Sequence, residues 1–152
     1  GERLTQRLNS IRRDADGDLP PGVHEAVWLE FKERFCSFAR SDQRVTLCQR
    51  IEQMVDEARA SQVVKRIIFG GSFVTSEAEP NDFDCVIVLE PKVQYEGLQP
   101  FQRWVADARE ASRRYRADAF VVRANQSTLP VYLDFLAINR DGKRVGLVEV
   151  RL

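Results

Sequence analysis

The run from Asp82 to Leu89 restricts the fold of this chain more than any other segment. Every residue in it except its two aspartates is apolar, which is typical of a central β-strand covered on both faces. An earlier β-branched run, 63–69, predicts a second strand that ends at Gly70-Gly71-Ser72. We therefore expect an α/β (or α+β) fold, in which helices flank a mixed central sheet of four or five strands.

Apolar residues at helical spacing predict three helices, at 24–38, at 42–58 behind an N-cap at Ser41, and at 100–115. Their expected buried stripes are Val27, Phe31, Phe35 and Phe38 with Trp28 beside them; Val45, Cys48, Ile51, Val55 and Ala58; and Phe101, Trp104, Val105, Ala108 and Ala111. Two further strands are expected at 117–122 and at 145–152, the latter after an Asp141-Gly142 hairpin turn. The segment 130–137 fits a helix or a strand equally.

The chain has 152 residues, which favours one domain with one core. Leu4, Leu8 and Ile11 have helical spacing, so residues 1–18 are expected to form an N-terminal helix or a flexible arm. Leu19-Pro20-Pro21-Gly22 cannot be helical, and residues 19–152 are expected to form the single domain.

Charge and cysteine content exclude several classes of protein. Lys plus Arg equals Asp plus Glu, at 23 each, so the chain lacks the basic signature of a typical nucleic-acid binder. Cys36, Cys48 and Cys85 form an odd set within apolar patterns, and we interpret them as reduced core residues of an intracellular protein. Neither a membrane span nor a secretory leader is apparent, so a soluble cytoplasmic protein is expected.

Asp82 and Asp84 carry the most specific chemical signal. Side chains alternate along a strand, so both carboxylates lie on one face, about 7 Å apart along the backbone, and Phe83 points to the other face. Two such carboxylates repel one another unless a cation lies between them. Mg²⁺ (or Mn²⁺) suits this pair, because it binds carboxylate oxygens and leaves room for substrate phosphates.

The Gly70-Gly71-Ser72 turn is the expected phosphate-binding element. Its glycines allow the backbone to approach a ligand closely, and Ser72 can begin a short helix through Phe73 and Val74 whose amides face a phosphate. Ser72 is interpreted as a phosphate ligand rather than a nucleophile, because no histidine lies in a motif with it. Each half of this pattern also occurs in ordinary turns; their order along the chain makes the combination specific.

The turn at Gly71-Ser72 followed by Asp82-Phe83-Asp84 resembles the signature of the DNA polymerase β-like nucleotidyltransferase superfamily. The resemblance implies a minimal nucleotidyltransferase fold, two metal-binding carboxylates and a third carboxylate on a later strand. More narrowly, an uncharacterised bacterial family of small nucleotidyltransferase-like proteins, of the DUF6932 type, is similar at four segments. These are Leu-Pro-Pro-Gly-Val-His-Glu-Ala at 19–26, Gly-Ser-Phe-Val-Thr at 71–75, Pro-Asn-Asp-Phe-Asp at 80–84 and Asn-Arg-Asp-Gly-Lys at 139–143.

The third carboxylate has two candidates. Asp118 lies in the apolar-acid-apolar pattern Ala117-Asp118-Ala119-Phe120, which the superfamily shows on its third active-site strand. Asp134 has the same local pattern in a segment of uncertain backbone. We favour Asp118, although a surface aspartate at a strand start would look the same.

The resemblance implies a metal-dependent enzyme that moves a nucleoside monophosphate from a nucleoside triphosphate such as ATP to a hydroxyl of a protein, an RNA or a small molecule. A bacterial toxin–antitoxin or phage-defence system is one setting for it, with a cognate protein or RNA as partner. The alternatives are a non-catalytic, antitoxin-like binding module and a nucleotide sensor. Phe73-Val74-Thr75 replaces the arginine that often follows the glycine-serine pair in small relatives, which leaves the acceptor and turnover open.

Other polar and aromatic residues have simpler interpretations. The arginines that close the third helix form a solvated face that suits the helix dipole, or alternatively reach a triphosphate or an RNA or protein acceptor. His24, Trp28 and Trp104 are interpreted as structural. The four arginines are Arg109, Arg113, Arg114 and Arg116.

Overall fold

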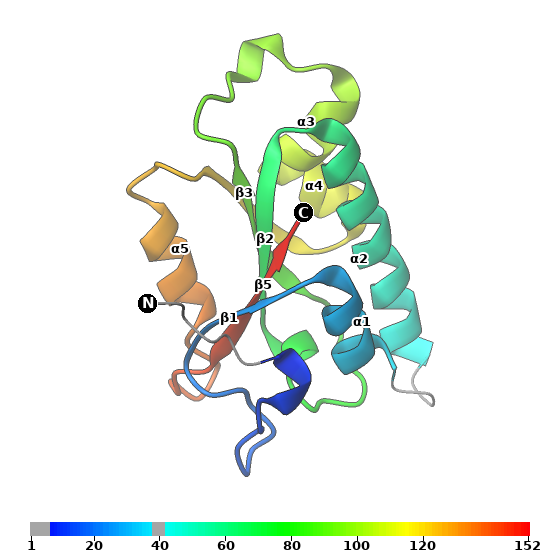
Figure 1. The fold of residues 1–152 in the computed structure, drawn as a ribbon, viewed down its shortest axis with the longest axis vertical. Helices are drawn as coiled ribbons and strands as arrows, with labels where there is room; N and C mark the ends of the chain where they lie inside the picture. The colour runs from blue at the N-terminus through cyan, green and yellow to red at the C-terminus, as the bar shows by residue number, and fades with distance from the viewer. Residues whose placement is uncertain (1–6, 38–41) are drawn as a thin grey trace.

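The computed structural model describes residues 7–37 and 42–152. It contains a five-stranded mixed sheet with helices on both faces, so the predicted α/β class is confirmed (Figure 1). The strands are β1 (Gly22–Ala26), β2 (Val64–Gly70), β3 (Asp84–Leu89), β4 (Asp118–Arg123) and β5 (Gly146–Arg151). The α-helices are α1 (Trp28–Cys36), α2 (Asp42–Ser61), α3 (Pro100–Ala106), α4 (Ala108–Tyr115) and α5 (Leu129–Leu136), and three short 3₁₀ helices are η1 (Leu8–Ser10), η2 (Ser72–Val74) and η3 (Tyr95–Gly97).

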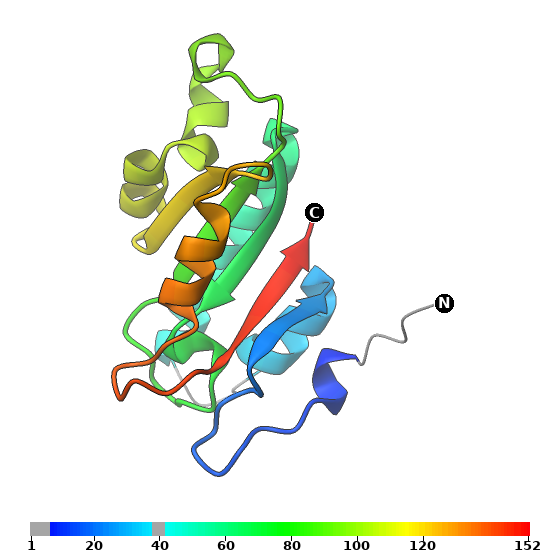
Figure 2. The ribbon, with the colours of Figure 1, turned by 90° about the vertical axis from the view of Figure 1, so that its left-hand side faces the viewer.

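The strand order is β1-β5-β2-β3-β4, visible edge to edge in Figure 2. The outer pairs β1–β5 and β3–β4 are parallel, whereas β2 is antiparallel to both of its neighbours. A parallel pair needs a long crossover, and α3 and α4 form the crossover between β3 and β4. This crossover returns the chain so that β3 and β4 begin at the same end of the sheet.

Two hydrophobic clusters lie on opposite faces of the sheet. The larger one lies beneath α1 to α4 and includes Phe69, Cys85 and Ile87; the smaller lies beneath α5 and includes Val86 and Val88. Alternate residues of β3 therefore enter different clusters, and both faces of this strand are buried, as its unbroken apolar sequence predicted.

The first predicted helix begins later than expected. His24 lies in β1, where it pairs with Val148, and α1 starts only at Trp28. Val27 is the N-cap residue and is 54% exposed, so its predicted burial is wrong. Phe31 and Phe35 are buried as predicted, whereas Phe38 and the proposed N-cap Ser41 lie outside the described residues. The physical reason is the parallel pairing with β5, which makes 22–26 an edge strand.

The other helices differ in detail from the predicted ones. In α2, Ile51, Val55 and Ala58 are buried as predicted, but Val45 is 47% exposed. The third predicted helix is two helices, α3 and α4, because Asp107 interrupts it and caps α4 by accepting a hydrogen bond from the backbone amide of Arg109. Two residues of its predicted stripe, Phe101 and Ala108, are exposed, whereas Val105 and Ala111 are buried as predicted. In the ambiguous segment 130–137, residues 130–136 are helical and form most of α5.

The cysteine interpretation is partly wrong. Cys36, at the end of α1, and Cys48, in α2, form a disulfide, with Cα atoms 5.9 Å apart. The two helices pack against each other, which brings together residues that are 12 positions apart. Cys85 is a free, fully buried thiol, as predicted.

Part of the N-terminal region packs onto the main core. Leu8, in η1, and Ile11 are both buried there, and Arg34 of α1 donates hydrogen bonds to their two carbonyl oxygens, at 2.6 and 2.8 Å. Leu4 lies outside the described residues. Across 7–37 and 42–152, no helix has the length and apolar character that crossing a bilayer requires.

Candidate acidic metal site

The N-terminal ends of β3 and β4 bring three carboxylates together. Asp84 opens β3 and Asp118 opens β4, and the two are direct partners in the parallel register. Asp82 lies two residues before β3. One carboxylate oxygen from each of Asp82, Asp84 and Asp118, here called the acidic trio, lies within 4.8 Å of the other two. The expected convergence of these side chains is present, and the choice of Asp118 over Asp134 agrees with this placement.

Strand alternation explains why the trio shares a face. Phe83, between the two aspartates, is 1% exposed, and its ring centroid lies 6.1 Å from that of Phe69 in the main core. Burial of Phe83 therefore holds Asp82 and Asp84 on the α5 side of the sheet. Three oxygen ligands that converge from neighbouring backbone segments match what Mg²⁺ or Mn²⁺ binds, so the residues fit the predicted ion.

The electrostatics of the trio are unfavourable without a cation. Burial, followed by repulsion from Asp82 and Asp118, raises the pKa of Asp84 to about 7, and a hydrogen bond with the Asp118 side chain adds to the shift. Near neutral pH a proton therefore partly compensates the negative charge. A divalent cation would displace that proton, since it can coordinate all three carboxylates at once.

The Gly70-Gly71-Ser72 turn lies directly against Asp84. Gly71 has φ +76°, and a Cβ atom built on it would collide with the Asp84 carboxylate. A Cβ on Gly70 would come within 2.7 Å of Leu136 and 2.9 Å of Leu147. At Gly71 the backbone conformation favours glycine and the Asp84 carboxylate opposes a side chain, whereas a side chain at Gly70 would require the two leucine side chains to shift. Ser72 is exposed and begins η2, the short helix predicted to follow the turn.

A buried arginine that sequence reasoning missed holds the segment after this turn. Arg44 of α2 has no exposed surface, and its guanidinium donates to the carbonyl oxygens of Phe73 and Thr75, at 2.9 Å each, and to that of Glu77 at 2.9 and 2.5 Å. A fourth carbonyl, of Phe35, accepts at 2.9 Å. Desolvation lowers the pKa of Arg44 to about 10, which leaves it charged at neutral pH. The one sign of this role in the sequence is position: Arg44 lies three residues before Leu47 and therefore on the same, buried side of the helix.

A second acidic cluster lies near the first, at the same end of the molecule. Asp14, Asp16 and Asp18 surround the ammonium of Lys143, with Nζ–oxygen distances of 2.6, 2.9 and 2.9 Å. We call this arrangement the lysine clamp. It lowers the pKa of Asp14 and raises that of Lys143, chiefly through these hydrogen bonds. The sequence Asp-Ala-Asp-Gly-Asp at 14–18 shows that this loop is acidic, but the lysine that it binds lies more than 120 residues away.

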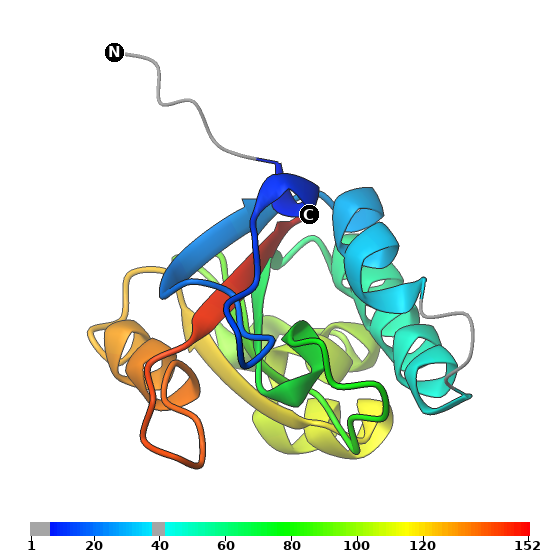
Figure 3. The same cartoon turned by 90° about the horizontal axis from the view of Figure 1, so that it is seen from below.

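The clamp also contacts the segment that carries η2. Ser76 donates its backbone amide to the Gly17 carbonyl at 3.0 Å, and a Cβ at Gly17 would collide with the Ser76 side chain. Figure 3 shows the N-terminal loop beside η2 at this end of the sheet. Two elements distant in sequence, α2 through Arg44 and the clamp through Gly17, therefore fix residues 73–77 relative to the trio.

The other predicted residues do not belong to the trio. Asp134 is on α5, 70% exposed at its side chain, and its carboxylate lies 3.5 Å from Arg144. Arg114 pairs with Glu57 at 2.6 Å and lies over the ring of Trp104, so it is held by α2 and α3 and differs from the solvated arginine that the sequence predicts. The Nε2 atom of His24 lies 2.7 Å from the Pro20 carbonyl oxygen, consistent with a structural role.

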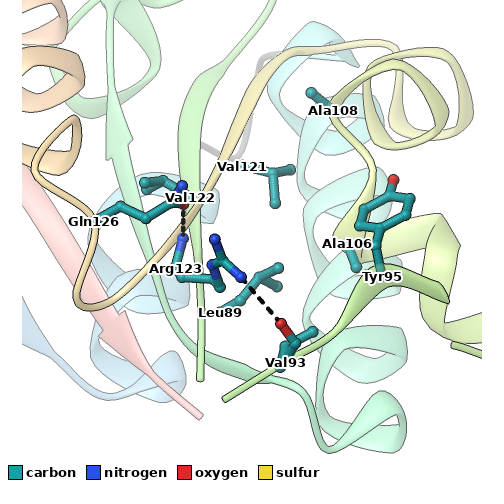
Figure 4. A pocket seen from close by; sticks show the side chains of 9 residues that line it. All are labelled: Leu89, Val93, Tyr95, Ala106, Ala108, Val121, Val122, Arg123 and Gln126. Atoms are coloured by element: carbon teal, nitrogen blue, oxygen red, sulfur yellow. Dashed lines mark hydrogen bonds between the residues drawn. The ribbon is translucent and has the colours of Figure 1, made fainter. Parts of the chain in front are cut away.

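A pocket of about 320 Å³ opens at the other end of β3 and β4 (Figure 4). Leu89 and Arg123, the last residues of these strands, line it with Tyr95. Arg123 donates its backbone amide to the Gln126 side chain at 2.6 Å and its guanidinium to the Val93 carbonyl at 3.4 Å. The five-residue rise of each strand separates this pocket from the trio by about 16 Å, so the pocket does not belong to the acidic site.

A family model described as a family of unknown function (DUF6932) matches residues 11–151. The match covers nearly the whole sequence, so the chain belongs to this family, as its four similar segments predicted. No curated protein and no solved structure gives a significant match. Family membership therefore brings no activity with it, and the acidic trio remains the part of the molecule with recognisable chemistry.

Proposed function

We propose that this protein is a metal-dependent nucleotidyltransferase of the DNA polymerase β-like superfamily, which transfers a nucleoside monophosphate from a nucleoside triphosphate to an acceptor hydroxyl. The observation that carries the proposal is the convergence of Asp82, Asp84 and Asp118 beside a glycine-serine turn. An acidic cluster alone is common on protein surfaces. This one is half-buried at Asp84, and a side chain at Gly71 would meet the Asp84 carboxylate, so the turn and the carboxylates form one site.

Each part of the site has a role in this reaction. Asp82 and Asp84 would hold Mg²⁺ or Mn²⁺, which when bound neutralises charge on the triphosphate. Backbone amides at Gly71-Ser72 and the exposed Ser72 hydroxyl would bind phosphate oxygens. Asp118, which lies on the edge strand β4, would orient the acceptor hydroxyl and accept its proton.

The bond changes follow from this arrangement. The acceptor oxygen forms a bond to the α-phosphorus while the bond between that phosphorus and the oxygen bridging to the β-phosphate breaks. Pyrophosphate leaves, and the hydroxyl proton passes to Asp118. Positioning and charge neutralisation supply most of the acceleration in such transfers, so the protein needs no covalent intermediate. A reaction without a covalent intermediate fits this site, which has three carboxylates and no nucleophile paired with a histidine.

The acceptor is proposed to be a hydroxyl on a protein, an RNA or a small molecule, and a bacterial toxin–antitoxin or phage-defence pair is the proposed setting. The chain has no net charge, so an RNA acceptor would have to be recognised by local basic groups.

Label transfer tests the proposal. The protein is incubated with Mg²⁺, lysate of its native host and ATP, GTP, CTP or UTP carrying label on the α- or the γ-phosphate. A nucleotidyltransferase moves α-label only, and both Asp82→Asn and Asp84→Asn abolish the transfer. Asp134→Asn is the matched control, because Asp134 is an aspartate outside the trio, and it should transfer normally.

Two other results would each replace the proposal. Metal-dependent nucleotide binding without transfer of either label would identify a nucleotide sensor. Absence of both binding and transfer, with a protein partner still bound by Asp82→Asn and Asp84→Asn, would identify a contact module that has kept only the fold.

A further inference from the structure

We propose that Arg140 binds phosphate oxygens of the nucleoside triphosphate at the acidic trio, and that the lysine clamp holds its loop in the position required. This inference rests on the proposed function and adds a binding residue that neither the glycine-serine turn nor the carboxylates supply.

The loop that carries Arg140 begins and ends beside the site. Leu136, the last residue of α5, and Leu147, in β5, both lie against Gly70, the first residue of the turn. The Val145 amide donates to the Ala137 carbonyl at 2.7 Å and so closes the base of the loop. Figure 2 shows this loop at the same end of the sheet as the segment between β2 and β3. The loop therefore extends from the face on which Asp82 and Asp84 lie.

Internal hydrogen bonds fix the shape of the loop. The Asn139 side-chain oxygen accepts from the amides of Asp141 and Lys143, both at 3.0 Å. The Asn139 amide donates to the Lys143 carbonyl at 2.9 Å, and its carbonyl accepts from Gly142 at 3.0 Å. The Lys143 ammonium is in turn held by three carboxylates. Arg140 thus projects from a loop that is ordered before any ligand arrives, which reduces the entropy lost on binding.

Arg140 is the basic group of this region that other side chains leave uncommitted. Lys143 is enclosed by aspartates, Arg144 pairs with Asp134, and Arg44 is buried among carbonyls. Within 7–37 and 42–152, no hydrogen bond or ion pair engages the exposed Arg140 side chain. Leu136 and Leu147, which flank the base of its loop, lie against Gly70, and Gly70 is the direct partner of Asp84 in the β2–β3 register, so Arg140 extends from a loop that begins beside the trio.

A guanidinium in this position suits a phosphate. Arginine presents a planar fork of N–H donors that can bind two phosphate oxygens at once. A triphosphate with one divalent cation still carries net negative charge, and the trio adds more, so a further cation beside the metal is favourable. The rival interpretation is that Arg140 only offsets the charge of the aspartates. The two interpretations predict opposite effects of removing Arg140 on the affinity for the metal–nucleotide complex, because a mere counter-charge repels the metal and makes no contact with the phosphates.

The test compares Arg140→Met with wild type in two titrations: Mn²⁺ alone, followed by electron paramagnetic resonance, and Mg²⁺ with α,β-methylene-ATP, followed by calorimetry. Removing the positive charge should tighten Mn²⁺ alone by a few-fold, since less repulsion opposes it. The same variant should bind the metal–nucleotide complex roughly 10- to 100-fold more weakly, the loss expected for charge-assisted hydrogen bonds. Arg144→Met, the matched control four residues away, should change neither affinity, and all three proteins should melt at similar temperatures.

Opposite effects in the two titrations support the proposal. If Arg140→Met binds the metal–nucleotide complex as tightly as wild type or more tightly, Arg140 is only a counter-charge and the inference is overturned, while the proposed function stands. If wild type itself binds no nucleotide with metal, the proposed function fails and the inference fails with it. A loss of nucleotide binding in Arg144→Met as large as in Arg140→Met would also overturn it, because general surface charge would then explain both.

Discussion

Replacing Asp84 with asparagine should stabilise the metal-free protein, and the gain should depend on pH. Asp84 shares the space of the trio with two further carboxylates, and burial and repulsion raise its pKa from 3.8 to about 7. Asparagine has nearly the same shape and carries no charge at any pH. It can also donate a hydrogen bond to Asp118, as the protonated carboxyl does.

The magnitude follows from the size of the shift. About three pKa units correspond to about 4 kcal/mol between the two protonation states, at 1.36 kcal/mol per unit. That figure is a ceiling, because solvent reaches the half-buried carboxylate and the site can relax. We expect Asp84→Asn to raise the free energy of unfolding by about 1–3 kcal/mol at pH 8, or about 2–10 °C in melting temperature for a chain of this size.

The sign of the pH dependence is fixed by the direction of the shift. In the unfolded chain Asp84 loses its proton near pH 3.8, whereas in the folded protein it keeps it until about pH 7. The folded state therefore binds more protons between these values, and wild-type stability falls as the pH rises through this window. The advantage of Asp84→Asn should be close to zero at pH 4, grow between pH 4 and 7, and stay constant above pH 7.

Urea denaturation at pH 5 and pH 8, without metal, measures this difference. Asp134→Asn is the control: its carboxylate is exposed and paired only at the surface, so its effect should be small and nearly equal at the two pH values. Mg²⁺ should stabilise wild type at pH 8 and leave Asp84→Asn unchanged. An Asp84→Asn variant that is less stable than wild type at pH 8, or a gain of equal size at both pH values, would refute the electrostatic account of the trio.

Three further substitutions test how the site is held together. Arg44→Met should lower the free energy of unfolding by about 3–5 kcal/mol in urea, because it leaves four carbonyls without their shared buried donor; a loss below about 1 kcal/mol would show that water replaces the guanidinium. Gly71→Ala should lower the free energy of unfolding by about 1–3 kcal/mol and weaken Mn²⁺ binding at least several-fold, since the φ of +76° at Gly71 and the Asp84 carboxylate both oppose a Cβ. Unchanged Mn²⁺ affinity would mean that the turn and the carboxylate are not coupled. Lys143→Met should speed protease cleavage near Gly17, because three carboxylates lose their shared cation. Equal cleavage rates in wild type and variant would show that the lysine clamp does not order the loop that contains Gly17.

The sequence allowed prediction of those features that depend on local periodicity. Asp82 and Asp84 share a face because strands alternate, and Asp118 joins them because the helical segment after β3 returns the chain to a parallel strand. Both inferences needed only the residues near each motif. The role of Gly71 in ligand binding stays a prediction, and its close approach to Asp84 became visible only in three dimensions.

The features that were missed depend on contacts between distant segments. Arg44 looks like a solvent-facing residue in the sequence, because its partners are backbone carbonyls that carry no residue-specific signal. Lys143 and Asp14 are 129 residues apart, and only the arrangement of β5 beside β1 brings their loops together. The sequence predicts a helix that starts at His24, just before the apolar stripe that begins at Val27, but pairing with β5 along the edge of the sheet outweighs that local preference.

Binding of Mn²⁺ in the presence of α,β-methylene-ATP, measured by electron paramagnetic resonance, tests the central claim most directly. If the acidic trio is the metal site of a nucleotidyltransferase, wild type binds Mn²⁺ more tightly with the nucleotide analogue than without it. Asp84→Asn then loses this binding, while Asp134→Asn keeps it. Mn²⁺ binding of equal strength in wild type and Asp84→Asn, or no effect of the nucleotide in wild type, would contradict the assignment of the trio as a nucleotide-linked metal site.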